Sequence, residues 1–520
     1  HLALKQQQLE AEGVEPAEAA RRARLALGNA TLYQETLSAQ WSFPALESLW
    51  RDIVFGLRML RKDKVFTIVA LVTLALGIGA NTAVFSLLNS LLWRSLPVRE
   101  PQQLVRLRLT NVPPTDRAWV NGRAVTAKER RRVPFPFYQE LEKHPDFQAV
   151  FGAAGQGPFV VDSAGEAYKL EAASVTGTYF PALGVEPVAG RLLTPDDDIA
   201  GGPSTGWGAV ISESAWTRLF HRSPAAIGAQ ISIERTPFTI IGVAPRTFTG
   251  VNPGSAPDVW MPASAFETMF PKWSWRANRD MGFIEPMARL KPGVDLNQAR
   301  DRLAALSVPM LRAVKPDGIS GQAEKHYLAM KIDMVPASSG YSYLVDIFRP
   351  ALWTLLAAVG AVLLIAATNL TNLILARATA RRKEIAIRLA IGASSGRIRR
   401  QLIVESSLLA MAGAGAGVVC ARWLAAALVR GASRDTTRIH LDASLDLTVL
   451  AFTGALLAAV VLIAGCIPAW SAVRGAIGEH ARGVTASKLA TRLRGGLIVL
   501  QVGLSLALLI AAGLLIASLR

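Results

Sequence analysis

Charged residues are scarce in this sequence, and cysteine is nearly absent. Asp, Glu, Lys and Arg make up only 18% of the 520 residues, whereas an ordinary soluble domain carries about 25%. Because 51% of the residues are hydrophobic, we infer that lipid solvates part of the chain. The two cysteines, Cys420 and Cys466, are too few for a disulfide framework. This composition excludes a disordered, collagen-like, coiled-coil or disulfide-stapled protein.

The sequence also lacks the motifs of nucleotide and metal sites. No G-x-x-x-x-G-K-[ST] segment occurs, so no loop with its lysine can cradle a phosphate, and 392–397 is interpreted as a helix-turn-helix junction. The six histidines show no metal-binding spacing, and no serine is expected in a G-x-S-x-G nucleophile elbow. Residues 196–198 lack calcium-loop spacing and are expected to form a solvated turn. We predict no catalytic, cofactor-binding or metal-binding residue and no enzymatic activity in this chain.

Long apolar runs are what the sequence does contain. A bilayer core requires about 20 mostly apolar residues, and five segments reach that length. They are residues 65–93, 351–376, 402–429, 447–473 and 495–519, the second of them following Pro350. Glu405 and Arg422 interrupt the third segment only near its ends, where such side chains can pair or extend to the interface. We therefore expect an α-helical transmembrane bundle of five spans.

Basic residues next to these spans predict the orientation of the chain. Cytoplasmic flanks retain Lys and Arg, and residues 377–401 and the linker 474–494 are rich in both. The net charge of +17 lies beside apolar runs, so we expect contact with membrane lipid rather than with nucleic acid. The N-terminus and these two segments are predicted to be cytoplasmic. Residues 94–349 are then extracytoplasmic.

The extracytoplasmic segment has the pattern of a large α/β domain. Residues 159–161 and 168–171 flank a turn-rich stretch that indicates a hairpin, and 231–233 with 238–241 flank Arg235 and Thr236 in the same way. Gly242 and Pro245 are expected to end the second of these hairpins. Helices are predicted at 135–143 and 297–306. The segment has no cysteine, so its own core must hold it, and its length allows two subdomains.

Residues 1–64 are predicted to be helical and cytoplasmic. Pro16 opens a helical run that ends at Gly28 and Asn29. An amphipathic helix follows, with apolar residues at three- and four-residue steps: Leu46, Leu49, Trp50, Ile53, Leu57 and Leu60. Such a helix can lie in the membrane interface with Trp50 at headgroup depth. The alternative, that it packs on other cytoplasmic parts, is equally consistent with the pattern.

Several motifs resemble one known family. The membrane entry reads Leu74-Ala75-Leu76-Gly77-Ile78-Gly79-Ala80-Asn81-Thr82, the outer segment has Val175-Thr176-Gly177-Thr178-Tyr179-Phe180, and the inner segment has Arg382-Lys383-Glu384-Ile385-Ala386-Ile387-Arg388 before Gly392-Ala393. In this order they closely resemble MacB/FtsX-type ABC transporter permeases, in particular the duplicated orphan permeases (ADOP). The resemblance covers nearly the whole chain. It implies a bacterial inner-membrane, multi-pass protein with a MacB-like periplasmic core domain.

The resemblance also implies an incomplete chain and a partner. Family members of this kind carry four spans per copy, so the fifth segment, 495–519, is similar to the start of a second copy. The chain is therefore expected to be a fragment. ATP hydrolysis is expected from a separate cytoplasmic ABC ATPase subunit. By this likeness, residues Arg382, Lys383, Glu384, Arg388, Gly392 and Ala393 are assigned to ATPase coupling.

The residues themselves leave two interpretations of this inner segment open. Its apolar side chains can anchor in a groove of a partner while its charges set the register, or its arginines can only fix topology and attract anionic lipid. In the third span, Gly413 and Gly417 are predicted to pack closely against another helix. The predicted function is mechanotransmission, efflux or extrusion driven by the ATPase. The alternative is a non-transporting relay that activates an extracytoplasmic partner such as a cell-wall hydrolase. An extracytoplasmic adaptor as partner would instead indicate efflux.

Overall fold

The computed structural model describes most of the chain. The described residues are 2–27, 44–113, 117–120, 123–126, 129–163, 165–272, 274–341, 343–380, 382–391, 394–432, 446–466, 468–470, 495–496, 498–510 and 513. Contacts divide the chain into a first unit, made of 1–78, 361–417 and 453–520, and a second unit, made of 79–360 and 418–452. Four long helices contribute segments to both units.

These four helices are long and apolar enough to cross a membrane. They are α5 (Lys64–Leu92), α13 (Tyr343–Ala380), α15 (Ser395–Ala432) and α16 (Leu447–Val461), which continues as a π-helical turn, Leu462–Cys466. Within the described residues the fifth apolar segment is a shorter helix, Ile498–Ile510. The fifth span therefore stays a prediction, because most of residues 511–519 lie outside the described part.

The second span begins earlier than the sequence indicated. Pro350 was expected to precede it, but Pro350 lies inside α13, which starts at Tyr343. Proline removes one backbone donor and tends to break a helix. Here the carbonyl of Pro350 accepts a bond from the Thr354 hydroxyl at 2.9 Å, and the helix continues for another 30 residues to Ala380. The span predicted at 351–376 therefore lies within a longer helix.

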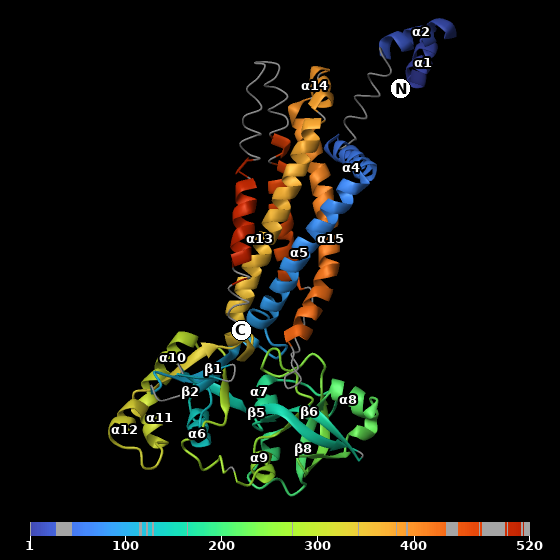
Figure 1. The fold of residues 1–520 in the computed structure, drawn as a ribbon. Helices are drawn as coiled ribbons and strands as arrows, with labels where there is room; N and C mark the ends of the chain where they lie inside the picture. Colours follow the sequence, from blue (N-terminus) through green and yellow to red (C-terminus); the bar gives the residue numbers. More distant parts are fainter. Residues whose placement is uncertain are drawn as a thin grey trace. The chain divides into compact units, whose positions relative to one another are not determined.

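The first unit is a bundle in which small residues meet larger ones. Its core includes Leu74 of α5, Leu363 of α13 and Ala410 of α15, and Figure 1 shows these three helices side by side. The unit also contains α1 (Leu2–Ala11), α2 (Pro16–Leu27), α4 (Pro44–Lys62) and α14 (Arg382–Ala390). The Thr371 hydroxyl donates to the Ala367 carbonyl of its own helix at 2.7 Å and lies 3.3 Å from the carbonyl of Ile463, so α13 contacts the π-helical turn.

The second unit contains a large mixed sheet and a separate two-stranded sheet. Its strands are β1 (Leu104–Thr110), β2 (Arg117–Val120), β3 (Arg123–Thr126), β4 (Glu129–Arg130), β5 (Phe147–Ser163), β6 (Glu166–Val175), β7 (Ala189–Gly190), β8 (Trp207–Ser212), β9 (Gln230–Ile233), β10 (Thr236–Ala244), β11 (Val259–Pro262), β12 (Glu285–Leu290) and β13 (Lys331–Pro336). The main path runs β13-β1-β12-β5-β6-β11-β8-β10-β7, and β2 pairs only with β3 among the described residues. The pairs β6/β11 and β8/β10 are parallel.

One part of this sheet closes on itself. β9 pairs with both β10 and β5, so β5, β6, β11, β8, β10 and β9 form a ring around a core that includes Ile211, Ile233 and Phe238. Strands β13, β1, β12 and the first part of β5 carry a helical layer on one face: α6 (Phe135–Glu142), α10 (Leu296–Ala305), α11 (Ser307–Ala313) and α12 (Gly321–Leu328). Figure 1 shows α10, α11 and α12 beside β1. The other helices of this unit are α7 (Tyr179–Leu183), α8 (Glu213–Phe220) and α9 (Ala265–Met269).

The predicted helices and the first hairpin are confirmed, and the second hairpin is shifted by one residue. The β9–β10 turn is Glu234-Arg235, and Thr236 already pairs with Ile233. Both turn residues have positive φ, 46° and 66°, which is the geometry of a tight two-residue hairpin turn. Gly242 does not end the second strand. It lies inside β10, where an added Cβ would be 1.9 Å from the carbonyl oxygen of Arg191.

The expectation of a solvated turn at residues 196–198 was wrong for two of the three. Asp197 is buried and binds the Arg191 guanidinium at 2.7 and 2.8 Å. Burial opposes the ionisation of Asp197, but the hydrogen bonds from Arg191 and from the Thr194 N–H outweigh it and hold the pKa of Asp197 below its usual value. Asp198 accepts bonds from the backbone N–H groups of Gly177 (2.9 Å) and Ser264 (2.7 Å). Asp197 therefore stabilises its own loop, whereas Asp198 joins segments that are distant in sequence.

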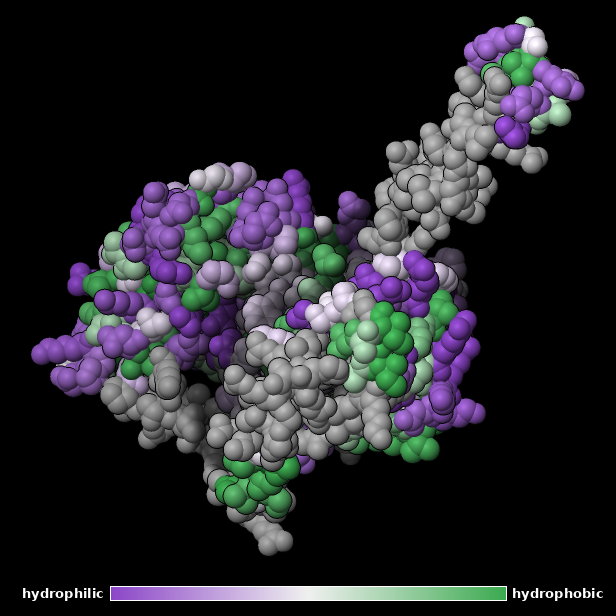
Figure 2. Space-filling view, turned by 90° about the horizontal axis from the view of Figure 1, so that it is seen from above, coloured by the Kyte–Doolittle hydropathy of each residue, from purple (hydrophilic) through white to green (hydrophobic). Residues whose placement is uncertain are grey.

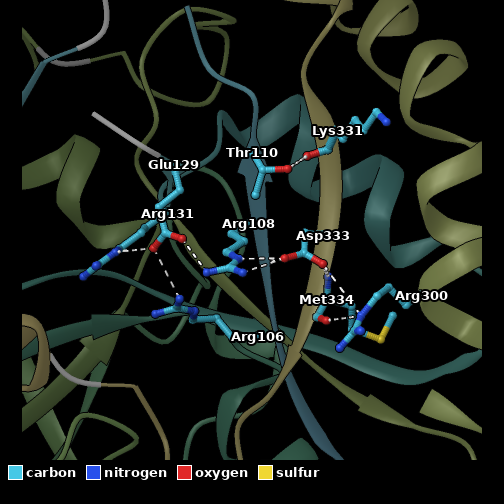
Figure 3. Close-up of polar contacts among 9 residues, drawn as sticks. All are labelled: Arg106, Arg108, Thr110, Glu129, Arg131, Arg300, Lys331, Asp333 and Met334. Atoms are coloured by element: carbon cyan, nitrogen blue, oxygen red, sulfur yellow. Dashed lines mark hydrogen bonds and ion pairs between the residues drawn. The ribbon is translucent and has the colours of Figure 1, made fainter. Parts of the chain in front are cut away.

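A second charged cluster lies on β1, β4 and β13 (Figure 3). Arg108 of β1 donates to Asp333 of β13 at 2.7 and 2.9 Å and to Glu129 of β4 at 2.5 Å. Arg106 and Arg131 also bond Glu129. Burial opposes the ionisation of Glu129, yet the Arg131 hydrogen bond and the nearby arginine charges lower its pKa. The cluster therefore ties β4 and β13 to β1 through ionised groups.

Candidate functional site

The inner segment assigned to coupling contains a short helix, α14, between α13 and α15 in the first unit. Glu384 and Ile387 are exposed on α14, and Ile391 is exposed in the turn that follows it. The exposed fractions of Ile387 and Ile391 are 59% and 81%. Positions 384, 387 and 391 are spaced three and four residues apart, which places them on one helix face. The view from above, onto the end where α14 lies in Figure 1, shows hydrophobic residues exposed among hydrophilic ones (Figure 2).

Arg388 connects this helix to α4. Its guanidinium bonds the Glu384 carboxylate one turn earlier, and its Cζ lies 5.7 Å from the centre of the Phe55 ring of α4. A guanidinium at this distance from a ring is attracted electrostatically. Arg388 therefore both stabilises α14 and attaches it to the amphipathic helix.

The structure describes only part of the assigned coupling set. Arg382 and Lys383 lie in α14, but the positions of their side chains are outside the described structure, and Gly392 and Ala393 lie outside the described residues. Their assignment to ATPase coupling stays a prediction.

Helix α4 packs against α15 through one narrow face. Asp52 is 8% exposed, and its carboxylate accepts a bond from Arg400 of α15 at 2.7 Å. One turn later, an added Cβ on Gly56 would lie 2.9 Å from Leu408 Cδ1 and 3.6 Å from Glu405 Cα. The glycine therefore allows close approach of the two helices, and the ion pair fixes their register.

Arg377 joins the inner ends of three helices. It donates to Glu405 of α15 at 2.9 Å and contacts the Met59 carbonyl at 3.4 Å. Its Cζ lies 5.0 Å from the centre of the Phe66 ring of α5. The side chains of Arg377 and Glu405 are only 16% and 13% exposed. Because charges with little water contact need a partner, this pair fixes α13 and α15 at the elbow between α4 and α5.

The two glycines predicted to pack helices both lie in α15 and are buried. An added Cβ on Gly413 would be 2.7 Å from Leu74 Cβ of α5. Gly415, between them, is exposed, and a Cβ there would meet nothing within 4 Å. The contact of Gly413 is therefore specific to one face of the helix.

Sequence reasoning missed the role of Asp52, Phe55 and Gly56. The sequence did contain a sign of this contact. Asp52 and Gly56 lie one turn apart on the same side of the amphipathic helix, where a small residue allows another helix to approach. The sign could not be interpreted from the sequence, because the partner residues on α14 and α15 lie more than 300 positions away.

Motifs for catalysis are not assembled in the described part of the chain. No group of three His, Cys, Asp or Glu residues there is placed to hold a metal ion. The letters of a G-x-S-x-G motif do occur at 202–206, contrary to the sequence-based expectation. That segment lies in turns that lead into β8, whereas a nucleophile elbow joins a strand to a helix.

Comparison with known families accounts for both units. Residues 67–306 match the MacB-like periplasmic core domain, and residues 356–477 match the FtsX-like permease C-terminal domain. The chain is an ABC-type permease of the MacB/FtsX type. It is a multi-pass inner-membrane protein with an extracytoplasmic domain. The α/β domain of the second unit is that extracytoplasmic domain, as expected from the sequence.

Curated relatives include two macrolide exporters. The chain is 24% identical over 217 residues to the macrolide export ATP-binding/permease protein MacB of Salmonella typhi, which covers 42% of this chain and 30% of that protein. It is 25% identical over 253 residues to MacB 1 of Yersinia pestis, covering 48% and 34% respectively. The matched part thus spans about a third of the length of these relatives.

Two solved structures also show likeness to this MacB/FtsX-type permease. The periplasmic region of MacB from Actinobacillus actinomycetemcomitans is 13% identical, with a TM-score of 0.32, covering 49% of this chain and 94% of that structure. The extracellular domain of the noncanonic ABC-type transporter YknZ is 11% identical, with a TM-score of 0.29, covering 44% and 98%.

Proposed function

We propose that this permease transmits ATPase-driven motion from α14 to its extracytoplasmic domain. An ABC ATPase encoded outside this sequence would dock on the exposed face of α14. The observation that carries the proposal is the pair of exposed isoleucines, Ile387 and Ile391. Large apolar side chains beside a charged pair are typical anchors for a groove on a partner.

The contacts around α14 provide a path for that motion. Arg388 attaches α14 to α4, Asp52 attaches α4 to α15, and Arg377 attaches α13 to α15. A displacement of α14 would therefore move α4 and the inner ends of α5, α13 and α15 together. Side chains held by several bonds transmit displacement because packed interfaces deform little.

The second unit has matching attachments at the other ends of the same helices. Asn81 of α5 donates to the Val359 carbonyl of α13 at 2.9 Å. Asn89 donates to Asp446, which caps α16, at 2.6 Å. The Leu96 N–H bonds the Ser338 carbonyl at 2.8 Å, next to β13. Movement of α5 would thus reach the edge of the sheet, in support of mechanotransmission, efflux or extrusion.

Docking can be tested by co-purification with candidate ABC ATPases. Ile387→Ser with Ile391→Ser removes the anchors, and Glu384→Arg with Arg388→Glu inverts the charges while keeping a pair one turn apart. We expect both double variants to lose at least about tenfold in ATPase association. The two exposed isoleucine anchors contribute roughly 1 kcal/mol or more each, and inverted charges place like charges against the partner. A matched control is Val188→Ser with Ile199→Ser, two exposed apolar residues of the extracytoplasmic domain.

The result distinguishes ATPase docking on α14 from a role of its arginines in membrane orientation alone. If the anchor variant keeps normal ATPase association, α14 is not the docking face, and its arginines act only on orientation and lipid. If association falls equally in the control, the loss reflects instability of the whole chain. Assignment to the duplicated orphan permeases stays a prediction that the full reading frame would test.

A further inference from the structure

Helix α4 presents three different faces, and the packing with α15 uses only one of them. Asp52 and Gly56, one turn apart, form the buried face. Trp50 and Leu57, seven residues apart, fall on a second face. Arg58 and Lys62, one turn apart, fall on a third. The sequence alone could not decide between packing and an interfacial position. Among the described residues, the packing with α15 leaves two faces of α4 exposed.

The second face is apolar and exposed. Trp50 is 66% exposed and Leu57 is 45% exposed, although residues of this type are normally buried in water-soluble parts. The exposed apolar surface continues in sequence onto α5, where Val65 and Ile68 are 76% and 61% exposed. Because α5 is a membrane-spanning helix of this permease, exposed residues at its start face lipid. The exposed apolar face of α4 is thus continuous in sequence with a surface that faces lipid.

The third face is basic. Arg58 and Lys62 are exposed on it, and Lys64 opens α5. Arg61 is also exposed, one turn after Leu57 at the edge of the apolar face. A helix with an apolar face for acyl chains, a tryptophan and a row of cations is the kind that lies in the interface of an anionic membrane. Each Lys or Arg near such a surface contributes about 1 kcal/mol of attraction.

We propose that α4 binds anionic phospholipid headgroups of the inner leaflet through Arg58, Arg61 and Lys62 while Trp50 and Leu57 insert among the acyl chains. The ion pair of Asp52 with Arg400 holds the helix so that both faces meet the bilayer. The bound leaflet positions the elbow at Asp63, where Phe66 N–H is 3.4 Å from the Asp63 carboxylate. This surface goes beyond the proposed function and does not depend on ATPase docking.

The test uses the full chain in nanodiscs of defined lipid. Cys420 and Cys466 are replaced by Ala, and Leu57→Cys carries an environment-sensitive NBD fluorophore. Phosphatidylglycerol is titrated into phosphatidylcholine, and the emission wavelength is read. Ile68→Cys provides the lipid reference and reports that α5 still spans the disc. Glu186→Cys, exposed in the extracytoplasmic domain, provides the water reference.

We expect the label at position 57 to shift toward the lipid reference as phosphatidylglycerol increases, and to shift back at high salt, because salt screens surface charge. Lys62→Gln should raise the titration midpoint roughly fivefold. Arg58→Gln with Lys62→Gln should abolish the response. Glutamine keeps the helix propensity, so these variants test charge rather than folding.

A matched control neutralises Arg246 and Lys272, two exposed cations of the extracytoplasmic domain, and should leave the titration unchanged. The proposal is overturned if the label emits as in water at every lipid composition. It is also overturned if emission is lipid-like without phosphatidylglycerol and unaffected by the double variant. Loss of the response in the Arg246/Lys272 control would likewise contradict it.

Discussion

In the extracytoplasmic sheet, aromatic side chains fill the core, whereas in the helix bundle of the first unit glycine and alanine occupy the contacts. Phe180, Phe248 and Trp260 lie with ring centres 5.8–5.9 Å apart and are buried. In the bundle, Gly413 meets Leu74, and Gly77 meets Leu363.

The two solvents explain the difference. In water, burying a large side chain gains about 1.5–3 kcal/mol, so large residues stabilise a core. Between helices in lipid, acyl chains are as apolar as leucine, and small residues stabilise by letting backbones approach. Ionised side chains differ between the two solvents as well. Arg377 and Glu405 have little contact with water, so the two charges are stabilised by each other.

The largest effect is expected from Glu405→Gln. It removes the carboxylate 2.9 Å from the Arg377 guanidinium, which is 16% exposed, and leaves, among the described residues, only the more distant Asp63 carboxylate, 3.8 Å away. Loss of one partner of a buried pair costs about 3–5 kcal/mol, and we expect the lower end of that range. Thermal unfolding of the detergent-solubilised chain measures the loss. Glu384→Gln, on the exposed face of α14, should change the midpoint little. The swapped pair Arg377→Glu with Glu405→Arg should recover part of the stability. Equal midpoints for Glu405→Gln and Glu384→Gln would show that the pair does not hold the bundle.

An intermediate effect is expected from Gly413→Leu. Its side chain would collide with Leu74, and overpacking of a tight contact costs about 1–3 kcal/mol. Gly415→Leu, two residues along the same helix, faces open space and should be neutral or slightly stabilising. Midpoints of thermal unfolding in lipid nanodiscs compare the two. If the two variants unfold alike, close backbone approach is not what holds α15 to α5.

The smallest effect is expected in the water-exposed domain, from Asp197→Asn. The hydrogen bonds from Arg191 and Thr194 hold the pKa of Asp197 down, so its contribution is fully present above the unfolded pKa of about 4. It is lost as the pH falls through the lower folded value. At neutral pH the substitution should cost about 1–2 kcal/mol.

The pH profile distinguishes this pair from the rest of the domain. Unfolding of the extracytoplasmic domain, followed by hydrogen exchange between pH 6 and pH 3, should be less steep in acid for Asp197→Asn. The neighbouring Asp196→Asn, at an exposed position, serves as the control and should follow the wild type. An unchanged profile for Asp197→Asn would contradict a native-state role for its charge.

Local pattern predicted much of this fold. The apolar runs gave the four candidate spans because bilayer thickness sets their length, and alternation with turn residues gave the hairpins at 159–171 and 231–241. The errors have physical causes. The second span was expected to begin after Pro350, but α13 already begins at Tyr343. The acidic run at 196–198 was expected to be solvated because the sequence does not show that Arg191 binds Asp197.

The candidate site was predictable only in outline. The charged segment 382–393 could be singled out by sequence because its motif is local. The contacts that attach it, from Arg388 to Phe55 and from Arg400 to Asp52, join residues more than 300 positions apart. No period or spacing encodes such pairs.

Composition and hydropathy alone indicated that this chain lies in a membrane, which segments are long and apolar enough to cross it, and that a large α/β domain stands between the first two of them. The reason is that the length and polarity of each segment must match its solvent. Tertiary structure decided which face of α4 is buried, which charges are paired and how β9 closes the strand ring, because these depend on the approach of residues that the sequence keeps far apart.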